Sequence, residues 1–217
     1  MANPKAAQIE STLRAYGFSA SADFVAGVQD YIGLLLRWNR TVSLTTVTEF
    51  DQILRFHFGE SLFALSAVPI ENGRLADVGS GAGFPGLALA MARPSLDVTL
   101  VESNSKKFAF LNEVIRELGL PNARSVRCRM GDVANRELFD FTTARALGQF
   151  DLFLRWSGDH LASAGKVVLW LGGEDVEAVG SKDGWNWDPH VSIPGSKQRF
   201  LLSGSPDGPR SDERGRK

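Results

Sequence analysis

The stretch Asp77-Val78-Gly79-Ser80-Gly81-Ala82-Gly83-Phe84-Pro85-Gly86 decides the fold class of this chain. An apolar run at 74–78 leads into it, and a helix-compatible segment follows at 87–92. Because glycine has no Cβ, such a loop can turn sharply and let a ligand lie against the main chain. A strand, a glycine loop and a helix in this order predict a site for a nucleotide-like cofactor.

The glycine loop fits two known patterns. Its glycines are Gly79, Gly81, Gly83 and Gly86. The first three, with Asp77 ahead of them, give D-x-G-x-G-x-G, which resembles the first motif of S-adenosylmethionine (SAM) methyltransferases. The last three give G-x-G-x-x-G, the dinucleotide fingerprint. A carboxylate at Asp77 repels a pyrophosphate but suits a cationic sulfonium. Both patterns expect an acidic residue for the ribose at the end of the next strand, and Glu102 stands there, about 20 residues beyond the loop.

Composition restricts the class of protein. The 217 residues are 43% hydrophobic, enough for one domain with a substantial core, and the net charge of -1 gives no overall basic signal for nucleic acid. A single cysteine, Cys128, excludes an internal disulfide framework, and no ligand spacing suggests a metal. No run is long enough to span a membrane and no signal peptide is evident, so we expect a cytoplasmic protein.

The chain divides into three predicted parts. Residues 1–70 form a helical segment, because apolar residues recur at helical spacing over 4–16, 22–40 and 49–67. Residues 71–204 form an α/β domain. Residues 205–217, which include four basic residues, form a disordered tail.

Strands and helices alternate in the second part. We expect strands at 74–78, 97–101, 124–128, 139–144, 165–171 and 198–202, with helices at 85–92, 105–118 and 149–162. This alternation predicts a parallel sheet covered on both faces, ending in an antiparallel pair. Such a sheet binds ligands at the carboxyl ends of its strands, where the glycine loop, Glu102 and Arg145 should converge.

Further motifs stand apart along the chain. They are Leu36-Arg37-Trp38-Asn39, Leu44-Thr45, Arg55-Phe56-His57-Phe58-Gly59-Glu60-Ser61 and Ala144-Arg145-Ala146. With the Phe-Pro-Gly ending of the glycine loop, they make residues 30–203 resemble the RsmG (GidB) family, which methylates N7 of a guanine in small-subunit ribosomal RNA. The resemblance implies a Rossmann-like class I SAM-dependent methyltransferase sheet with an N-terminal helical segment.

The resemblance also implies site residues. Cofactor contacts to SAM fall on Asp77, Gly79, Gly81, Gly83, Phe84, Glu102, Met130, Gly131 and Arg145. Arg145, together with Arg129, is the candidate catalytic residue. The expected partner is small-subunit ribosomal RNA, naked or in the assembled small subunit, and the expected state is a monomer without metal or membrane contact.

This chain departs from the family pattern at three positions. Glu60 replaces the usual Asp, Ser43 replaces an Asn, and Leu171 stands where a lysine is common. His57 and Glu60 lie three residues apart on the expected helix over 49–67, which predicts a local pair that orients this helix against the glycine loop.

Three functions stay open at this point. N7 of guanine carries a free lone pair, so methylation there needs positioning and no strong base, and the sequence offers no obvious base. The first alternative is an NAD(P)-dependent Rossmann oxidoreductase, against which Asp77 argues. The second is a non-catalytic SAM-binding ribosome-assembly factor, which Leu171 favours.

Overall fold

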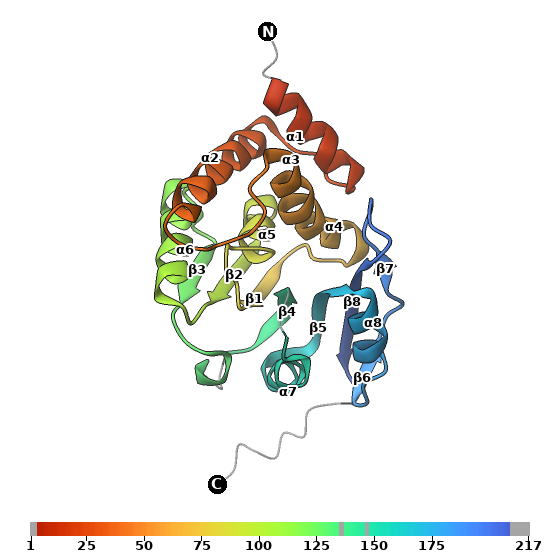
Figure 1. Ribbon diagram of the computed structural model, residues 1–217. Coiled ribbons are helices and arrows are strands. Elements are labelled where there is room, and N and C mark those ends of the chain that lie inside the picture. Colours follow the sequence, from red (N-terminus) through yellow and green to blue (C-terminus); the bar gives the residue numbers. More distant parts are fainter. Residues whose placement is uncertain (1–3, 135–136, 146–147, 209–217) are drawn as a thin grey trace.

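The computed structural model describes residues 4–134, 137–145 and 148–208 and places a mixed sheet between two layers of helices (Figure 1). Its strands are β1 (Gly73–Val78), β2 (Leu96–Val101), β3 (Ala123–Val126), β4 (Phe139–Arg145), β5 (Leu161–Gly172), β6 (Trp185–Trp187), β7 (Val191–Ser192) and β8 (Arg199–Pro206). The strand order is β3-β2-β1-β4-β5-β8-β6, with β7 paired to β8. The pairs from β3 to β5 are parallel, and β8 is antiparallel to β5, β6 and β7. The predicted Rossmann-like α/β fold with a closing antiparallel pair is therefore confirmed.

Helices are found at all the predicted positions, and two further helical elements, at 130–132 and 173–180, were not predicted. The helical elements are α1 (Pro4–Ala15), α2 (Ala22–Asn39), α3 (Phe50–Ile53), the π-helical turn η1 (Leu54–Gly59), α4 (Glu60–Ala67), α5 (Gly86–Ala92), α6 (Ser105–Glu117), the short 3₁₀ turn η2 (Met130–Asp132), α7 (Phe150–His160) and α8 (Gly173–Gly180). The Ser21 side chain caps α2 and the Asn104 side chain caps α6, each by accepting from backbone N–H groups of the first turn. The single helix expected over 49–67 is a continuous run of α3, η1 and α4.

The last third of the chain differs from the sequence prediction. The segment 172–196, which is rich in glycine and proline, contains α8, β6 and β7, none of which was predicted. Strand β8 continues to Pro206, because it pairs with β5 up to Gly204 and with β6 through Pro206. Residues 205–206 are therefore strand and not tail. Residues 209–217 of the predicted tail, with their basic side chains, lie outside the described residues, as does Ala146 of the Ala-Arg-Ala motif.

The N-terminal helical segment shares its core with the sheet. One cluster of buried apolar side chains joins α1, α2, η1 and α4 to α5, α6 and β1, and a second lies between the sheet and α7 and α8. At the centre of the first cluster, the buried Tyr31 hydroxyl donates to the Ala82 carbonyl over 2.7 Å. The division of the chain at residue 70 stays a prediction, since this core crosses it.

The Tyr31 hydroxyl supplies a test of this shared core. Tyr31→Phe keeps the ring but leaves the buried Ala82 carbonyl without its donor, so we expect a loss of about 1–2 kcal/mol in the free energy of unfolding. Urea denaturation followed by fluorescence and by circular dichroism measures it. The two probes should give one common transition; separate transitions would show that the helices and the sheet unfold independently.

Candidate functional site

The carboxyl ends of four strands meet at one edge of the sheet. Val78 of β1 lies opposite Val101 of β2 and Ala144 of β4, and Val101 lies opposite Val126 of β3. The ends of these strands therefore lie side by side. This edge is where parallel α/β sheets bind their ligands.

Glycines in the loop after β1 serve two separate needs. Gly79, Gly81 and Gly83 have φ angles of 72°, 56° and 85°, a region that favours glycine. A Cβ on Gly83 would overlap the Tyr31 hydroxyl, and a Cβ on Gly86 would overlap Leu100. A Cβ on Gly81 would meet nothing nearer than the Gly79 carbonyl oxygen, 3.7 Å away. Gly83 and Gly86 thus permit close packing, whereas Gly81 faces open space that a ligand can use.

Asp77 lies beneath the loop with its carboxylate turned to the protein. It is 1% exposed, and its two oxygens accept from the Gly86 N–H over 3.1 Å and from the Thr143 hydroxyl over 3.1 Å. Burial raises the pKa of this carboxyl group to about 6, although both hydrogen bonds oppose the shift. Asp77 holds the loop to β4 and α5, and its predicted contact with a cofactor stays a prediction.

Glu102 joins the loops after β1 and β2. One carboxylate oxygen accepts from the Gly81 N–H over 2.9 Å, and the other accepts from the Asn104 N–H over 2.7 Å. The side chain is largely buried at the strand end where the sequence placed it. A carboxylate has about four acceptor positions, so room remains for ligand hydroxyl groups.

The Phe84 ring packs against side chains of the N-terminal helical segment. It stacks against the rings of Tyr31 and His57, with centroids 5.1 Å and 4.8 Å away, and meets Phe58 edge-on at 5.0 Å. Only 7% of Phe84 is exposed. Any contact of this residue with a cofactor therefore falls mainly to its backbone.

Arg145 emerges from the end of β4 into a buried ionic cluster. Its guanidinium pairs with Glu60 of α4 over 3.2 Å, and Arg199 of β8 pairs with the other Glu60 oxygen over 2.9 Å. The Trp170 indole N–H donates to the Glu60 carbonyl over 2.7 Å. Burial raises the pKa of Glu60, and the two arginines oppose that shift. The cluster brings α4, β4, β5 and β8 together at the ligand-binding edge.

His57 does not form the expected pair with Glu60. Its Nε2 atom lies 2.9 Å from the Thr45 hydroxyl, and its Nδ1 atom is buried without a partner among the described residues. The stacking on Phe84 does orient this turn against the glycine loop, as predicted. Burial, and next the charge of Arg145, lowers the pKa of His57 to about 4.

Arg129, Met130 and Gly131 lie beyond the end of β3, in and before η2. Strand β3 ends at Val126 and not at residue 128 as predicted. Arg129 lies in the loop that follows and is exposed. Met130 packs partly against the second apolar cluster, while Gly131 is exposed with open space beside it. Their assignment to the cofactor, and that of Arg129 to catalysis, stay predictions.

Sequence reasoning missed Arg199. It begins a strand that follows an irregular segment, and its partner Glu60 is far away in the chain. A single basic residue carries no local pattern, so only the pairing of β8 with β5 could have revealed it.

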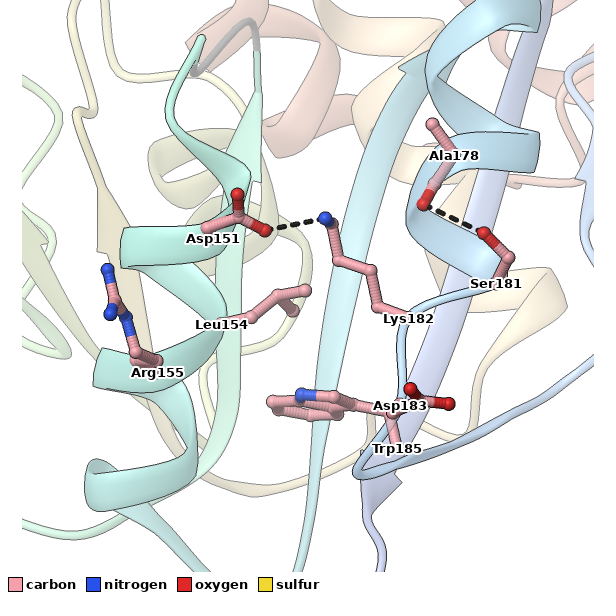
Figure 2. A pocket seen from close by; sticks show the side chains of 8 residues that line it. All are labelled: Asp151, Leu154, Arg155, Ala178, Ser181, Lys182, Asp183 and Trp185. Carbon is pink, nitrogen blue, oxygen red and sulfur yellow. Dashed lines mark hydrogen bonds and ion pairs between the residues drawn. The ribbon is translucent and has the colours of Figure 1, made fainter.

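A groove with a volume of about 650 Å³ lies elsewhere, between α7 and α8. The residues that line it include Asp151, Arg155, Lys182, Asp183 and Trp185 (Figure 2). The Lys182 ammonium reaches across it to Asp151 over 2.5 Å. Its charges balance and none of the predicted cofactor residues lines it, so it is separate from the glycine-loop site.

Two absences apply to residues 4–134, 137–145 and 148–208. No helix there is both long and apolar enough to cross a membrane. No group of three or more His, Cys, Asp or Glu side chains there could hold a metal ion.

The part of the chain that contains the glycine loop matches the model of a known protein family. The model of the GidB family, described as rRNA small subunit methyltransferase G, matches residues 25–185. This chain belongs to the GidB family. A family member, Ribosomal RNA small subunit methyltransferase G of Xanthomonas campestris pv. campestris (strain B100), is 40% identical over 191 residues, covering 85% of this chain and 88% of that protein.

Solved structures share the GidB fold at low sequence identity. A SAM dependent methyltransferase from Aquifex aeolicus has a TM-score of 0.61 at 14% identity, covering 75% of this chain and 96% of its own. The glycopeptide N-methyltransferase MtfA complexed with SAM has a TM-score of 0.56 at 13% identity, covering 68% and 93%. At these identities the likeness concerns the fold, which is that of SAM-dependent methyltransferases.

The depressed pKa of His57 predicts a pH dependence of stability. Its pKa of about 4 in the folded protein lies below the ordinary histidine value of 6.5, so between these pH values the unfolded chain binds the proton more readily. Burying His57 in its neutral form contributes to the free energy of unfolding in full above about pH 6.5, and this contribution is lost as the pH falls toward 4. We expect the stability advantage of the parent over His57→Gln to shrink by about 2–3 kcal/mol from pH 7 to 4.

Urea denaturation at several pH values measures this difference. His190→Gln, which removes an exposed imidazole, is the control for losing one histidine. An advantage that stays constant from pH 7 to pH 4 would contradict the buried neutral state of His57.

Proposed function

We propose that this protein transfers a methyl group from SAM to N7 of a guanine in small-subunit ribosomal RNA. The observation that carries the proposal is membership of the GidB family together with a methyltransferase fold and an open, glycine-lined edge beside Glu102. The reaction is SAM-dependent RNA methylation, and N7 as the acceptor is the finer part of the proposal.

The residues at the edge fit SAM in three respects. The space beside Gly81 accepts a ligand against the main chain, and Glu102 keeps acceptor positions for ribose hydroxyl groups. A buried Arg145 Nη1 atom has no partner among the described residues and can donate to a carboxylate or a phosphate. SAM supplies an electrophilic methyl group; the protein supplies the positions of the groups around it.

This chain's residues favour transfer by positioning. Guanine N7 has an in-plane lone pair and no proton to lose, so the reaction needs alignment and exclusion of water more than a base. His57, whose pKa is about 4, is neutral at physiological pH and does not add a positive charge beside Arg145. Arg145 can hold the methionine carboxylate of SAM, guanine O6 or an RNA phosphate, all of which suit a planar guanidinium.

The two alternatives are not favoured. A dinucleotide-dependent oxidoreductase has no support from the family match or from the related structures, which are methyltransferases. A SAM-binding assembly factor that transfers no methyl group would have the same fold and the same glycine loop as an enzyme. Only a measurement of methyl transfer therefore separates these two functions. We further propose that the protein acts as a monomer in the cytoplasm on naked RNA or on the assembled small subunit.

One experiment tests the proposed reaction. Purified protein is incubated with labelled SAM and with small subunits, or their naked RNA, from cells that lack the protein. Label should enter the RNA at one guanine, and cleavage chemistry specific for N7-methylguanine should map it. Label on another atom would overturn N7 as the acceptor, and SAM binding without transfer would support the assembly-factor alternative.

A matched pair of glycine variants separates the cofactor site from the fold. Gly81→Ala places a methyl group in the open space, so we expect SAM affinity to fall by at least about tenfold with modest loss of stability. Gly83→Ala collides with Tyr31 and should cost about 1–3 kcal/mol of stability. Calorimetric titration with SAM and thermal melting measure both; unchanged SAM affinity in folded Gly81→Ala would remove the loop from the cofactor site.

Arg145 is expected to matter through its shape as well as its charge. Arg145→Ala and Arg145→Lys should each lower single-turnover methyl transfer by at least about tenfold, equivalent to about 1.4 kcal/mol. Lysine keeps a charge but lacks the planar fork. Arg116→Ala, which removes an exposed arginine paired with its neighbour Glu117, is the control. Normal rates in a folded Arg145→Ala protein would exclude a catalytic role.

A further inference from the structure

The cluster around Glu60 carries an excess of positive charge. A single carboxylate, 2% exposed, faces the guanidinium groups of Arg145 and Arg199. Two cations on one anion leave a net charge of about +1 at a partly buried position, which is costly unless an anion joins it. The buried Nη1 atom of Arg145 has no partner among the described residues and can donate to such an anion.

Arg199 lies on the far side of the cluster from the glycine loop. It is paired with Gly172 at the carboxyl end of β5, so the antiparallel strand β8 begins at the ligand-binding edge. Between β1 and β8 lie β4 and β5, so at about 4.8 Å per strand the backbones of β1 and β8 are roughly 14 Å apart. Arg145, on β4 next to β1, therefore stands on a strand nearer to the glycine loop than Arg199 does.

The Arg199 guanidinium is fixed and yet accessible. It pairs with Glu60 over 2.9 Å and lies over the Phe56 ring at 4.4 Å, while 39% of its side chain is exposed. A guanidinium has five N–H donors. Glu60 accepts from Nη1 and the Ser196 hydroxyl accepts from Nε over 3.4 Å, so the remaining donors on the two terminal nitrogens are available.

We propose that Arg199 binds a backbone phosphate of the RNA strand beside the target guanine. This inference rests on the proposed function and adds a residue to the substrate site. A partly exposed guanidinium held by an ion pair and an aromatic ring matches a phosphate in shape and charge.

The test compares three variants of the full chain. Arg199→Ala removes the proposed contact, and Arg199→Lys keeps a point charge. Arg74→Ala is the matched control: its side chain is 41% exposed against 39% for Arg199, it pairs with Asp97 and Glu137, and it lies over the Phe139 ring at 5.2 Å. Arg74 stands at the amino end of β1, away from the ligand edge.

Two affinities are measured for each variant. The first is for an unmethylated small-subunit RNA transcript at several salt concentrations, and the second is for SAM by calorimetry, with thermal melting as the check on folding. We expect Arg199→Ala to weaken RNA binding by about fivefold or more and to lower the salt slope by about 0.7–1, as for one lost phosphate contact. SAM affinity should change less than twofold, and Arg199→Lys should restore the slope.

Other outcomes overturn the inference. Equal RNA affinity in Arg199→Ala and Arg74→Ala would show that Arg199 does not touch the RNA. A loss of SAM affinity with RNA binding unchanged would assign Arg199 to the cofactor. If Arg199→Ala does not fold, Arg199→Gln, which removes the charge but keeps a polar side chain, takes its place. A salt slope equal to that of the parent in folded Arg199→Gln overturns the inference. Failure of the unchanged protein to bind both the transcript and the assembled small subunit would overturn the proposed function as well, and is thereby distinguished from failure at Arg199 alone.

Discussion

The buried carboxylate of Asp77 is the interaction on which the site depends. It bonds to the first N–H of α5 and to the Thr143 hydroxyl of β4, so one group fixes the loop, the following helix and the neighbouring strand. Burying an acid is costly, which is why its pKa rises to about 6, and the two hydrogen bonds offset part of that cost. Any ligand at the glycine loop is positioned by this buried arrangement.

The glycine loop in turn supports the helices above it. The Tyr31 hydroxyl donates to the Ala82 carbonyl, and the Tyr31 ring stacks on Phe84. The Phe84 ring also stacks on His57 of η1. The same helical run supplies Phe56 beneath Arg199 and, at the start of α4, Glu60 between the two arginines. The cofactor loop and the arginine cluster are therefore held by one stretch of chain, and a shift in that stretch affects both.

The sequence by itself determined the features that have a local pattern. Apolar residues at helical spacing located α1, α2 and the run from α3 to α4, and the alternation of strands and helices located β1 to β5. The glycines with Asp77 and Glu102 marked the ligand edge, because a loop that needs positive φ angles and close packing restricts its residues. The family resemblance rested on the same motifs and is confirmed.

Only the tertiary structure decided what depends on residues far apart in the chain. The elements α8, β6 and β7 lie in a glycine- and proline-rich segment, and the two strands are set by pairing with β8 rather than by propensity. His57 and Glu60 are near neighbours on one helical run, yet each finds its partner elsewhere, in Thr45 and in the two arginines. A buried charge is satisfied by whichever groups the folded chain brings within reach, and sequence spacing does not encode that choice.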